Sequence, residues 1–283
     1  MESVVPVAGS AVPARAVPQR RVSRPRVMGE GSVAGISVVT VAVLFLLWWL
    51  ATAEQWIPPL FLPGPGAIWA AFVQSVGGQG NGAPLLENIG WSLFRVLSSF
   101  ILAVLVGVPV GLAMGTSRIA RGIFDPPIEF YRPLPPLAYL PLIIIWFGIG
   151  ELSKVLLIFL ACVAPVALAA RAGVRSASQE QINAAFSMGA SRSQVVRHVI
   201  MPSALPDILV GLRIGMGVGW TTLVAAEMVA ATAGLGQMVL NASNFLRTDV
   251  VIMGIIVIGL FAYAFEMAMR QLEKRLVPWK GKV

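Results

Sequence analysis

The sequence predicts an all-helical, polytopic membrane protein with six transmembrane helices, and three observations support this fold class. With 57% hydrophobic and 12% charged residues and a mean hydropathy of +0.81, this chain of 283 residues has too little polar surface to cover a soluble globule. Its apolar residues form long runs, and roughly 20 such residues in a helix cross the bilayer core. Its basic residues gather between alternate runs, as in multi-pass proteins.

The N-terminal part combines a polar tail with one apolar run. Residues 1–31 contain five arginines and no periodic apolar face, which predicts a disordered basic cytoplasmic tail. Residues 32–90 contain the first transmembrane helix, over Val33–Ala53, and an external loop. Residues 51–53 (Ala-Thr-Ala) resemble a signal-peptidase site, but the apolar run is longer than the core of a typical leader, so we expect this helix to be retained.

Residues 91–275 contain the other five transmembrane helices, and residues 276–283 form a cytoplasmic tail. The expected helices are Val96–Ser117, Pro133–Gly150, Leu152–Ala170, Ile208–Ala233 and Val250–Met269, with the second and third of these forming a hairpin. Six prolines between residues 126 and 141 predict that a bent or interrupted element enters Pro133–Gly150. Such backbone is tolerated at membrane depth where protein or a water-filled path covers it, so this region is a candidate lining of a transport route.

Two of the expected helices carry glycines at every fourth position. These are Gly107, Gly111 and Gly115 in the first stripe and Gly211, Gly215 and Gly219 in the second. Such stripes let membrane helices approach closely. Packing within one subunit is favoured over a contact with a second copy at either stripe.

The distribution of basic residues predicts the orientation. If both termini are cytoplasmic, the internal segments hold 17 of the 21 Lys and Arg residues, and only Arg95, Lys154 and Arg247 lie towards the outside. Arg213 falls near the inner end of the fifth helix. The net charge of +8 is spread between the apolar runs, so orientation in a membrane explains it and nucleic-acid binding is excluded.

A polar interruption between the fourth and fifth helices predicts two short helices. Ser178 with Gln181, and Ser191 with Gln194, have capping-box spacing, and Gly189 can end the first helix in the left-handed conformation. The second helix should then run towards Pro202. On the first helix, Ile182, Ala185 and Phe186 form a small apolar face that suits insertion into a groove of another protein. The alternative is an amphipathic connector that packs on its own membrane domain.

Four further residues are candidates for a translocation path or gate. Glu227 lies inside the fifth helix, where a charge is expected to face a subunit interface or a wet cavity. Arg132 belongs to the proline-rich connection, where a salt-bridged hinge and a solvated turn are both possible. For Trp146 and Trp220, core packing or anchoring at the membrane interface is the default interpretation and substrate contact the alternative.

The sequence excludes several chemistries. One cysteine, Cys162, and one histidine, His198, exclude a disulfide and a paired Cys/His metal site within this chain, so no metal or cofactor is expected. No G-x-x-x-x-G-K-[ST] phosphate loop occurs, so ATP-driven work requires a partner. The sequence shows no cluster of a nucleophile, a general base and metal ligands, so an enzyme is not expected.

The polar interruption resembles the cytoplasmic coupling motif of binding-protein-dependent ABC importer permeases. That motif reads Glu-Ala-Ala, three residues, Gly, nine residues, Ile-x-Leu-Pro, and Ala184, Ala185, Gly189 and Pro202 match it here. Val199 and Met201 keep the apolar character of their motif positions. Asn183 stands for the Glu of the motif, which removes a charge available to the ATPase. The resemblance implies coupling helices at about residues 179–200.

The chain is identified by resemblance as a member of the nitrate/sulfonate/taurine group of these permeases. Residues 132–142, 146–150 and 217–227 carry this similarity, which extends over about residues 35–280. It implies a type I ABC importer permease fold in a bacterial inner membrane and transport of taurine or a related alkanesulfonate. The implied partners are a second permease copy, two ATPase subunits, an extracytoplasmic substrate-binding protein and the lipid bilayer. Ala233 stands where Arg is expected in that group.

A second class of function is a stand-alone, ion-coupled secondary transporter. In that case Glu227 would bind the coupling ion.

Overall fold

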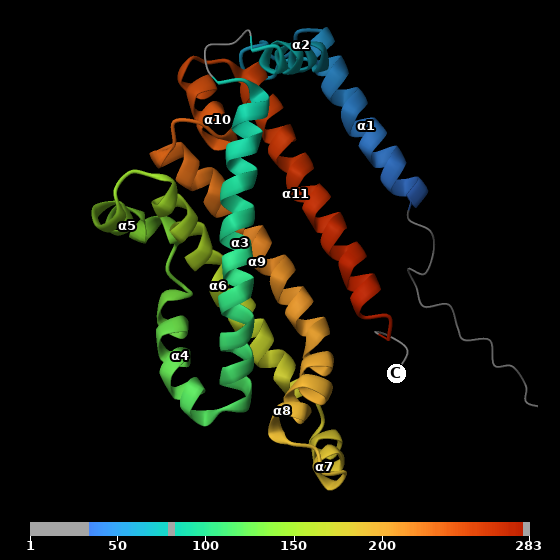
Figure 1. Ribbon diagram of the computed structural model, residues 1–283. Coiled ribbons are helices and arrows are strands. Elements are labelled where there is room, and N and C mark those ends of the chain that lie inside the picture. The colour runs from blue at the N-terminus through green and yellow to red at the C-terminus, as the bar shows by residue number, and fades with distance from the viewer. Residues whose placement is uncertain (1–33, 79–82, 280–283) are drawn as a thin grey trace, which may run out of the picture. The chain divides into compact units, whose positions relative to one another are not determined.

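The computed structural model describes residues 34–78 and 83–279, and in that part it contains helices and no strand (Figure 1). The predicted tail over 1–31 lies outside the described residues. The chain divides into two compact units, residues 1–47 and 48–283. In the first unit, the described part is the N-terminal portion of helix α1 (Ala34–Ala53), which is apolar and contains no acidic or basic residue.

The second unit holds the end of α1 and all later elements. They are, in chain order, α2 (Pro65–Val76), α3 (Leu85–Thr116), α4 (Arg118–Tyr131), η1 (Pro136–Tyr139), α5 (Leu140–Phe147), α6 (Glu151–Gly173), η2 (Val174–Ser176), α7 (Gln179–Ser187), α8 (Arg192–Val195), the π-helical turn η3 (Val196–Ile200), α9 (Met201–Ala230), α10 (Leu235–Asn244) and α11 (Thr248–Leu276). Helix α3 begins eleven residues before the expected Val96, because its first three turns are amphipathic rather than purely apolar.

Among the described residues, five helical segments are long and apolar enough to cross a membrane. They are Gly35–Ala53, Leu85–Thr116, Glu151–Ser176, Arg192–Ala230 and Thr248–Leu276. A sixth crossing is formed if α4 and the η1–α5 pair make one span with a bend of 97°. The all-helical, polytopic fold class is therefore confirmed, and the bend lies where the prolines predict it.

The prediction of one continuous transmembrane helix over Pro133–Gly150, the third of the six, is wrong. The structure replaces it with η1 and the eight-residue α5. At 1.5 Å per residue, α5 is roughly 12 Å long and cannot cross the bilayer alone. The proline-rich run breaks the helix because it lacks backbone donors. The predicted hairpin is thus reduced to packing of Leu140 and Ile143 of α5 against Leu157 of α6.

The core of the second unit is α6, held between α3 and α9. A Cβ added at Gly111 of α3 would lie 2.2 Å from the Ala167 carbonyl oxygen of α6, and one at Gly115 would lie 2.3 Å from Val174. On α9, a Cβ at Gly211 would lie 2.1 Å from Ala169 of α6. Both glycine stripes therefore pack on α6 within this subunit, as predicted.

Helix α11 completes the bundle through charge pairs with α9. Arg213 of α9 pairs with Glu266, and its Nη1 lies 3.4 Å from Glu273 Oε2, both on α11. Arg213 and Glu227 do not pair with each other, because fourteen residues of helix separate them by roughly 21 Å. Each of the two charges has its own partners in the structure.

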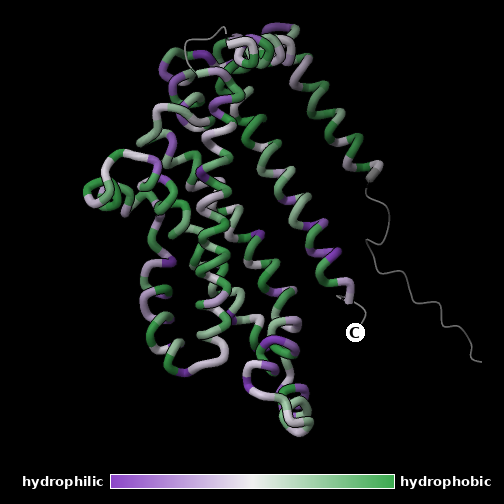
Figure 2. The backbone as a smooth tube through the Cα atoms, in the orientation of Figure 1, coloured by the Kyte–Doolittle hydropathy of each residue, from purple (hydrophilic) through white to green (hydrophobic). Residues whose placement is uncertain are grey.

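The two ends of the second unit carry different polar elements. Helices α7 and α8 lie at one end, and α2 and α10 lie at the other (Figure 1). Apolar residues predominate along the middle of the long helices, and polar residues are prominent around α7 and α8 (Figure 2). The bundle therefore presents two polar ends that α3, α6 and α9 connect.

We predict that Gly211→Val destabilises the protein by about 1–3 kcal/mol, because the new side chain overlaps Ala169 of α6. Gly217→Val is the matched control, since it makes the same change on the same helix where a Cβ meets nothing within 4 Å. Thermal unfolding of the purified protein in detergent measures the difference. Equal losses of stability in the two variants would contradict the close contact between α9 and α6.

Candidate functional site

Helix α7 forms and ends as its local sequence predicts. Ser178 Oγ accepts a hydrogen bond of 3.2 Å from the Gln181 amide, and Gln181 Oε1 accepts one of 3.1 Å from the Ser178 amide. Gly189 has a φ of +85°, and its amide donates to the Phe186 carbonyl at 2.9 Å. The left-handed glycine turns the chain immediately after the helix.

The second short helix differs from its expectation. Ser191 and Gln194 form the predicted capping box, with hydrogen bonds of 2.8 and 3.4 Å. However, α8 does not end at Pro202, because it continues through the π-helical turn η3 into α9. Pro202 lies in the first turn of α9, where its missing amide hydrogen and fixed φ are tolerated. Residues 179–200, hereafter the docking segment, are thus joined to α9 without a break in the helix.

The apolar face predicted for α7 is divided between the interior and the surface. Ala185 is buried and Ile182 packs beside it, against a cluster that includes Val195 and Ile200. Only Phe186 of the predicted trio is exposed, at 45%, and Met188 beyond the helix is exposed at 82%. The expectation of one outward face is therefore corrected, because the inward side of α7 is needed to attach it to the bundle.

The polar residues and a hollow complete the outer surface of the docking segment. Asn183 and Ala184 are exposed, and Asn183 Oδ1 accepts a hydrogen bond of 3.0 Å from Gln179 Nε2 on the same helix. A hollow of about 410 Å³ lies between α7 and α8, and Gly189 and His198 are among its lining residues. The outer surface of the segment thus has both an exposed aromatic ring and a recess.

At the other end of the bundle, α3 carries a buried polar stripe. Asn88, Ser92, Arg95 and Ser99 follow one another at intervals of four, three and four residues and are all buried. This spacing places them on one face of the helix. Ser99 Oγ donates to the Val155 carbonyl of α6 at 2.9 Å. The same spacing is present in the sequence and is the signal for this site, whereas the distribution of basic residues predicts only that Arg95 lies towards the outside.

Arg95 and Glu227 form a fully enclosed ion pair. Arg95 Nη1 lies 2.7 Å from Glu227 Oε1, and the two side chains are 1% and 0% exposed. Ser92 Oγ lies 2.7 and 2.9 Å from the two Glu227 carboxylate oxygens. The Gly236 amide donates to Glu227 Oε2 at 2.8 Å. A buried carboxylate is stable only with such partners, and these contacts supply them.

The same side chains hold the segment before α10. Three consecutive amides, of Gly234, Leu235 and Gly236, donate to Asn88 Oδ1, Ser92 Oγ and Glu227 Oε2. Gly234 has a φ of +136°, and a Cβ there would lie 2.5 Å from the Glu227 carboxyl carbon. Only glycine therefore fits this position. The backbone amides at the N-terminus of α10 thus donate to side chains of α3 and α9 rather than to a capping residue of the helix itself.

Two further charges extend the pair towards the surface. Arg95 Nε and Nη2 donate to the two Glu151 carboxylate oxygens at 2.6 and 2.9 Å, and Lys154 Nζ lies 2.8 Å from Glu151 Oε1. We call Arg95, Glu151, Lys154 and Glu227 the charge cluster. Its formal charge is balanced, and it joins α3, α6 and α9.

The structure does not bring the four predicted path residues together. Arg132 and Trp146 are exposed, on the connection after α4 and on α5. Trp220 and Glu227 are buried, in the core and in the charge cluster. Their place on a route stays a prediction. Near Arg132, the Arg171 guanidinium of α6 pairs with Asp125 of α4, which favours the salt-bridged hinge over a solvated turn.

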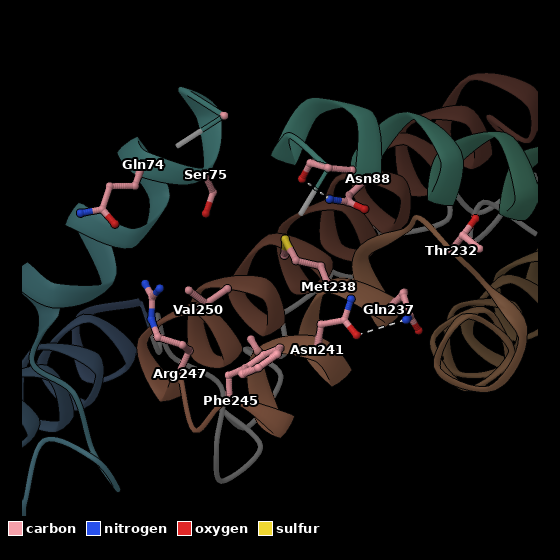
Figure 3. A pocket seen from close by; sticks show the side chains of 13 residues that line it. Gln74, Ser75, Asn88, Thr232, Gln237, Met238, Asn241, Phe245, Arg247 and Val250 are labelled. Atoms are coloured by element: carbon pink, nitrogen blue, oxygen red, sulfur yellow. Dashed lines mark hydrogen bonds between the residues drawn. The ribbon is translucent and has the colours of Figure 1, made fainter. Parts of the chain in front are cut away.

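A pocket of about 300 Å³ with many polar lining residues lies at the end of the second unit opposite the docking segment, and Asn88 of the buried polar stripe lines it. Gln74, Asn88, Gln237 and Asn241 contribute side chains from α2, α3 and α10 (Figure 3). Arg247 lines it as well, and hydrogen bonding to a neighbouring carboxylate raises the pKa of its guanidinium above the ordinary value. The pocket therefore offers amide groups and a guanidinium that is already paired with Asp249.

These helices define a type I ABC importer permease fold. The structure matches a chain of the MetNI methionine ABC transporter, solved in inward-facing conformations, with a TM-score of 0.61. The match covers 68% of this chain and 95% of that chain at 19% identity. Residues 103–278 match the family of binding-protein-dependent transport system inner membrane components, and the chain belongs to this family. It is a multi-pass component of the inner membrane and not a catalytic enzyme.

Related chains confirm the expected nitrate/sulfonate/taurine group. The taurine transport system permease protein TauC of Escherichia coli is 55% identical over 249 residues, which cover 88% of this chain and 90% of that protein. The putative aliphatic sulfonates transport permease protein SsuC of the same organism is 34% identical, over 82% and 87% of the two chains. The nitrate import permease protein NrtB of Synechocystis is 28% identical, over 86% and 90%.

We predict that Gly189→Val abolishes coupled transport without preventing membrane insertion, because a branched side chain disfavours the positive φ at this turn. Gly189→Asn should retain transport, since Asn tolerates the left-handed conformation. ATP-dependent uptake and the amount of protein in the membrane fraction are the measurements. Wild-type uptake by Gly189→Val would refute a role for this turn.

We also predict that Glu227→Gln destabilises the protein by about 3–5 kcal/mol, because it leaves Arg95 with excess buried charge. The double variant Arg95→Gln with Glu227→Gln should recover part of this loss, since the remaining pair of Glu151 and Lys154 is balanced. Thermal unfolding in detergent provides the comparison. If the double variant is as unstable as the sum of the two single variants, the charges are not coupled.

Proposed function

We propose that this chain is the permease subunit of an ATP-driven importer for taurine or a related alkanesulfonate. The observation that carries the proposal is the 55% identity with the taurine permease over 88% of the chain. In this proposal two copies of the permease assemble with two ATPase subunits and an extracytoplasmic substrate-binding protein. Selection of the solute is shared with that binding protein, and the permease supplies the moving gate.

The docking segment is the part of the chain that receives force from the ATPase. Phe186 and Met188 project from it, whereas Ala185 attaches it to the bundle. A displacement passes directly into α9, which continues from the segment, and reaches α6 through the short turn η2. ATP binding changes the equilibrium between inward and outward access only if the ATPase contacts the segment differently in the two states.

Charge on the segment supports the proposed orientation. Arg171, Arg175, Arg192 and Arg197 lie in or beside it, and basic residues favour the cytoplasmic side. The proposal therefore places both termini in the cytoplasm and the charge cluster towards the outside. The polar pocket then faces the side from which the binding protein delivers its solute.

The ion-coupled alternative depends on a carboxylate that is free to bind an ion. The Glu227 carboxylate already accepts hydrogen bonds from Ser92, Arg95 and Gly236. A coupling ion would have to compete with a buried guanidinium for the same oxygens. The contacts of this residue favour the ATP-driven importer.

Reconstitution into proteoliposomes tests the proposal. With ATPase, binding protein and internal ATP, we expect accumulation of radiolabelled taurine, and we expect none when the ATPase subunit is omitted. An imposed ion gradient without ATP should have no effect. Uptake by the permease alone, driven by such a gradient, would establish the secondary transporter instead.

A further inference from the structure

Glu151 occupies an unusual position in the charge cluster. Its carboxylate lies between the Arg95 guanidinium, at 2.6 and 2.9 Å, and the Lys154 ammonium, at 2.8 Å. Both cations are buried, whereas the Glu151 side chain is 38% exposed. Arg95 has the buried Glu227 as a second partner, and Glu151 is the one carboxylate that contacts both enclosed cations and also reaches the surface.

The exposed part of Glu151 must contact water or protein. A charge at the end of a membrane helix avoids lipid because its transfer into hydrocarbon is costly. Where the exposed part of Glu151 faces water, a solute at this end of the bundle reaches its carboxylate. The charged groups of Arg95 and Lys154 become accessible to a solute only when that carboxylate moves.

Arg95 is held so that only part of its guanidinium can exchange ligands. Nη1 stays fixed by Glu227 Oε1 and the Ala233 carbonyl oxygen, both at 2.7 Å. Nε and Nη2 form the pair of donors that faces Glu151. A pair of parallel N–H donors suits the two oxygens of a carboxylate and equally two oxygens of a sulfonate. The site is therefore preorganised for an oxyanion with a single negative charge.

Charge balance restricts which anion can take the place of Glu151. A simple anion on Arg95 and Lys154 would leave the displaced carboxylate without a cation. A solute that carries an ammonium group close to its anionic group supplies that cation itself. When such a solute takes the place of the Glu151 carboxylate, every charge stays paired. No charge is then left without a partner in a poorly solvated place, where it would be costly.

We propose that Arg95, Lys154 and Glu151 form a binding site for a zwitterionic aminosulfonate. The sulfonate displaces the Glu151 carboxylate from Arg95 and Lys154, and the ammonium group pairs with the displaced carboxylate. This inference rests on the proposed function and extends it, because it places discrimination between aminosulfonates and plain alkanesulfonates in the permease itself.

Competition between two solutes of matched size tests this site. Taurine and ethanesulfonate share the sulfonate and differ in the amino group, so the ratio of their uptake rates reports recognition of the ammonium. The ratio is measured in proteoliposomes with the complete importer and the same binding protein throughout, so the preference of the binding protein cancels between variants. Glu151→Gln should lower the ratio of taurine to ethanesulfonate about tenfold, which corresponds to about 1.4 kcal/mol.

Glu87→Gln is the matched control, because Glu87 is an exposed carboxylate in the first turn of α3 at the same end of the bundle. It should leave the ratio unchanged. If Glu151→Gln fails to assemble, the double variant Glu151→Gln with Lys154→Gln restores charge balance and should show the same reduced ratio.

The outcomes separate this site from the proposed function. ATP-dependent uptake of taurine by the wild type, with an unchanged ratio in the Glu151 variants, overturns the site and leaves the proposed function standing. The same change of ratio in Glu87→Gln also overturns it. Absence of ATP-dependent taurine uptake in the wild type overturns both.

Discussion

The close contact of α6 with the glycine faces of α3 and α9 is the constraint on which the rest of the structure depends. At Gly111 and Gly211 the neighbouring helix lies where a side chain would otherwise begin. Helices packed this closely cannot slide past one another without a clash or a void. The three helices therefore form a rigid core, and α6 has one of them on each side.

This core has a different polar site at each end. The docking segment leaves α6 and enters α9 at one end, so it is attached to two of the three helices. At the other end the charge cluster draws one residue each from α3 and α9 and two from α6. A displacement of α8 thus reaches Glu227 of the charge cluster along the continuous helix formed by α8, η3 and α9.

The polar contacts at the far end add specificity to this packing. Apolar helices and glycine stripes leave the axial position of α10 open, whereas Asn88, Ser92 and Glu227 each bind one amide at its start. Buried polar groups often cost stability and fix one arrangement, as they do in other helical assemblies. In this protein they fix the segment before α10 onto α3 and α9.

Much of this architecture follows from local sequence rules. The apolar runs predict the helices, the capping boxes and Gly189 predict α7, and the glycine spacing predicts packing within one subunit. The family motif locates the docking segment. These features depend on residues within a few turns of one another, so local sequence patterns are enough to predict them.

The features that sequence reasoning missed are those that depend on distant residues. The partner of Glu227 is Arg95, 132 residues earlier in the chain, and no local pattern joins them. The inward side of α7 packs on Val195 and Ile200, which follow a turn whose direction local sequence does not define. The π-helical turn that carries the chain past Val199 also depends on packing rather than on propensity.

A distance measurement within one permease copy tests the rigid core most directly. Spin labels at Leu105→Cys on α3 and Ile214→Cys on α9 occupy exposed positions, and Cys162→Ala removes the native thiol. Pulsed electron paramagnetic resonance on the assembled importer, with one labelled copy diluted among unlabelled copies, gives the distance with and without ATP. We predict the same distance distribution in both states, and a shift of several ångströms between them would contradict a core that moves as one body.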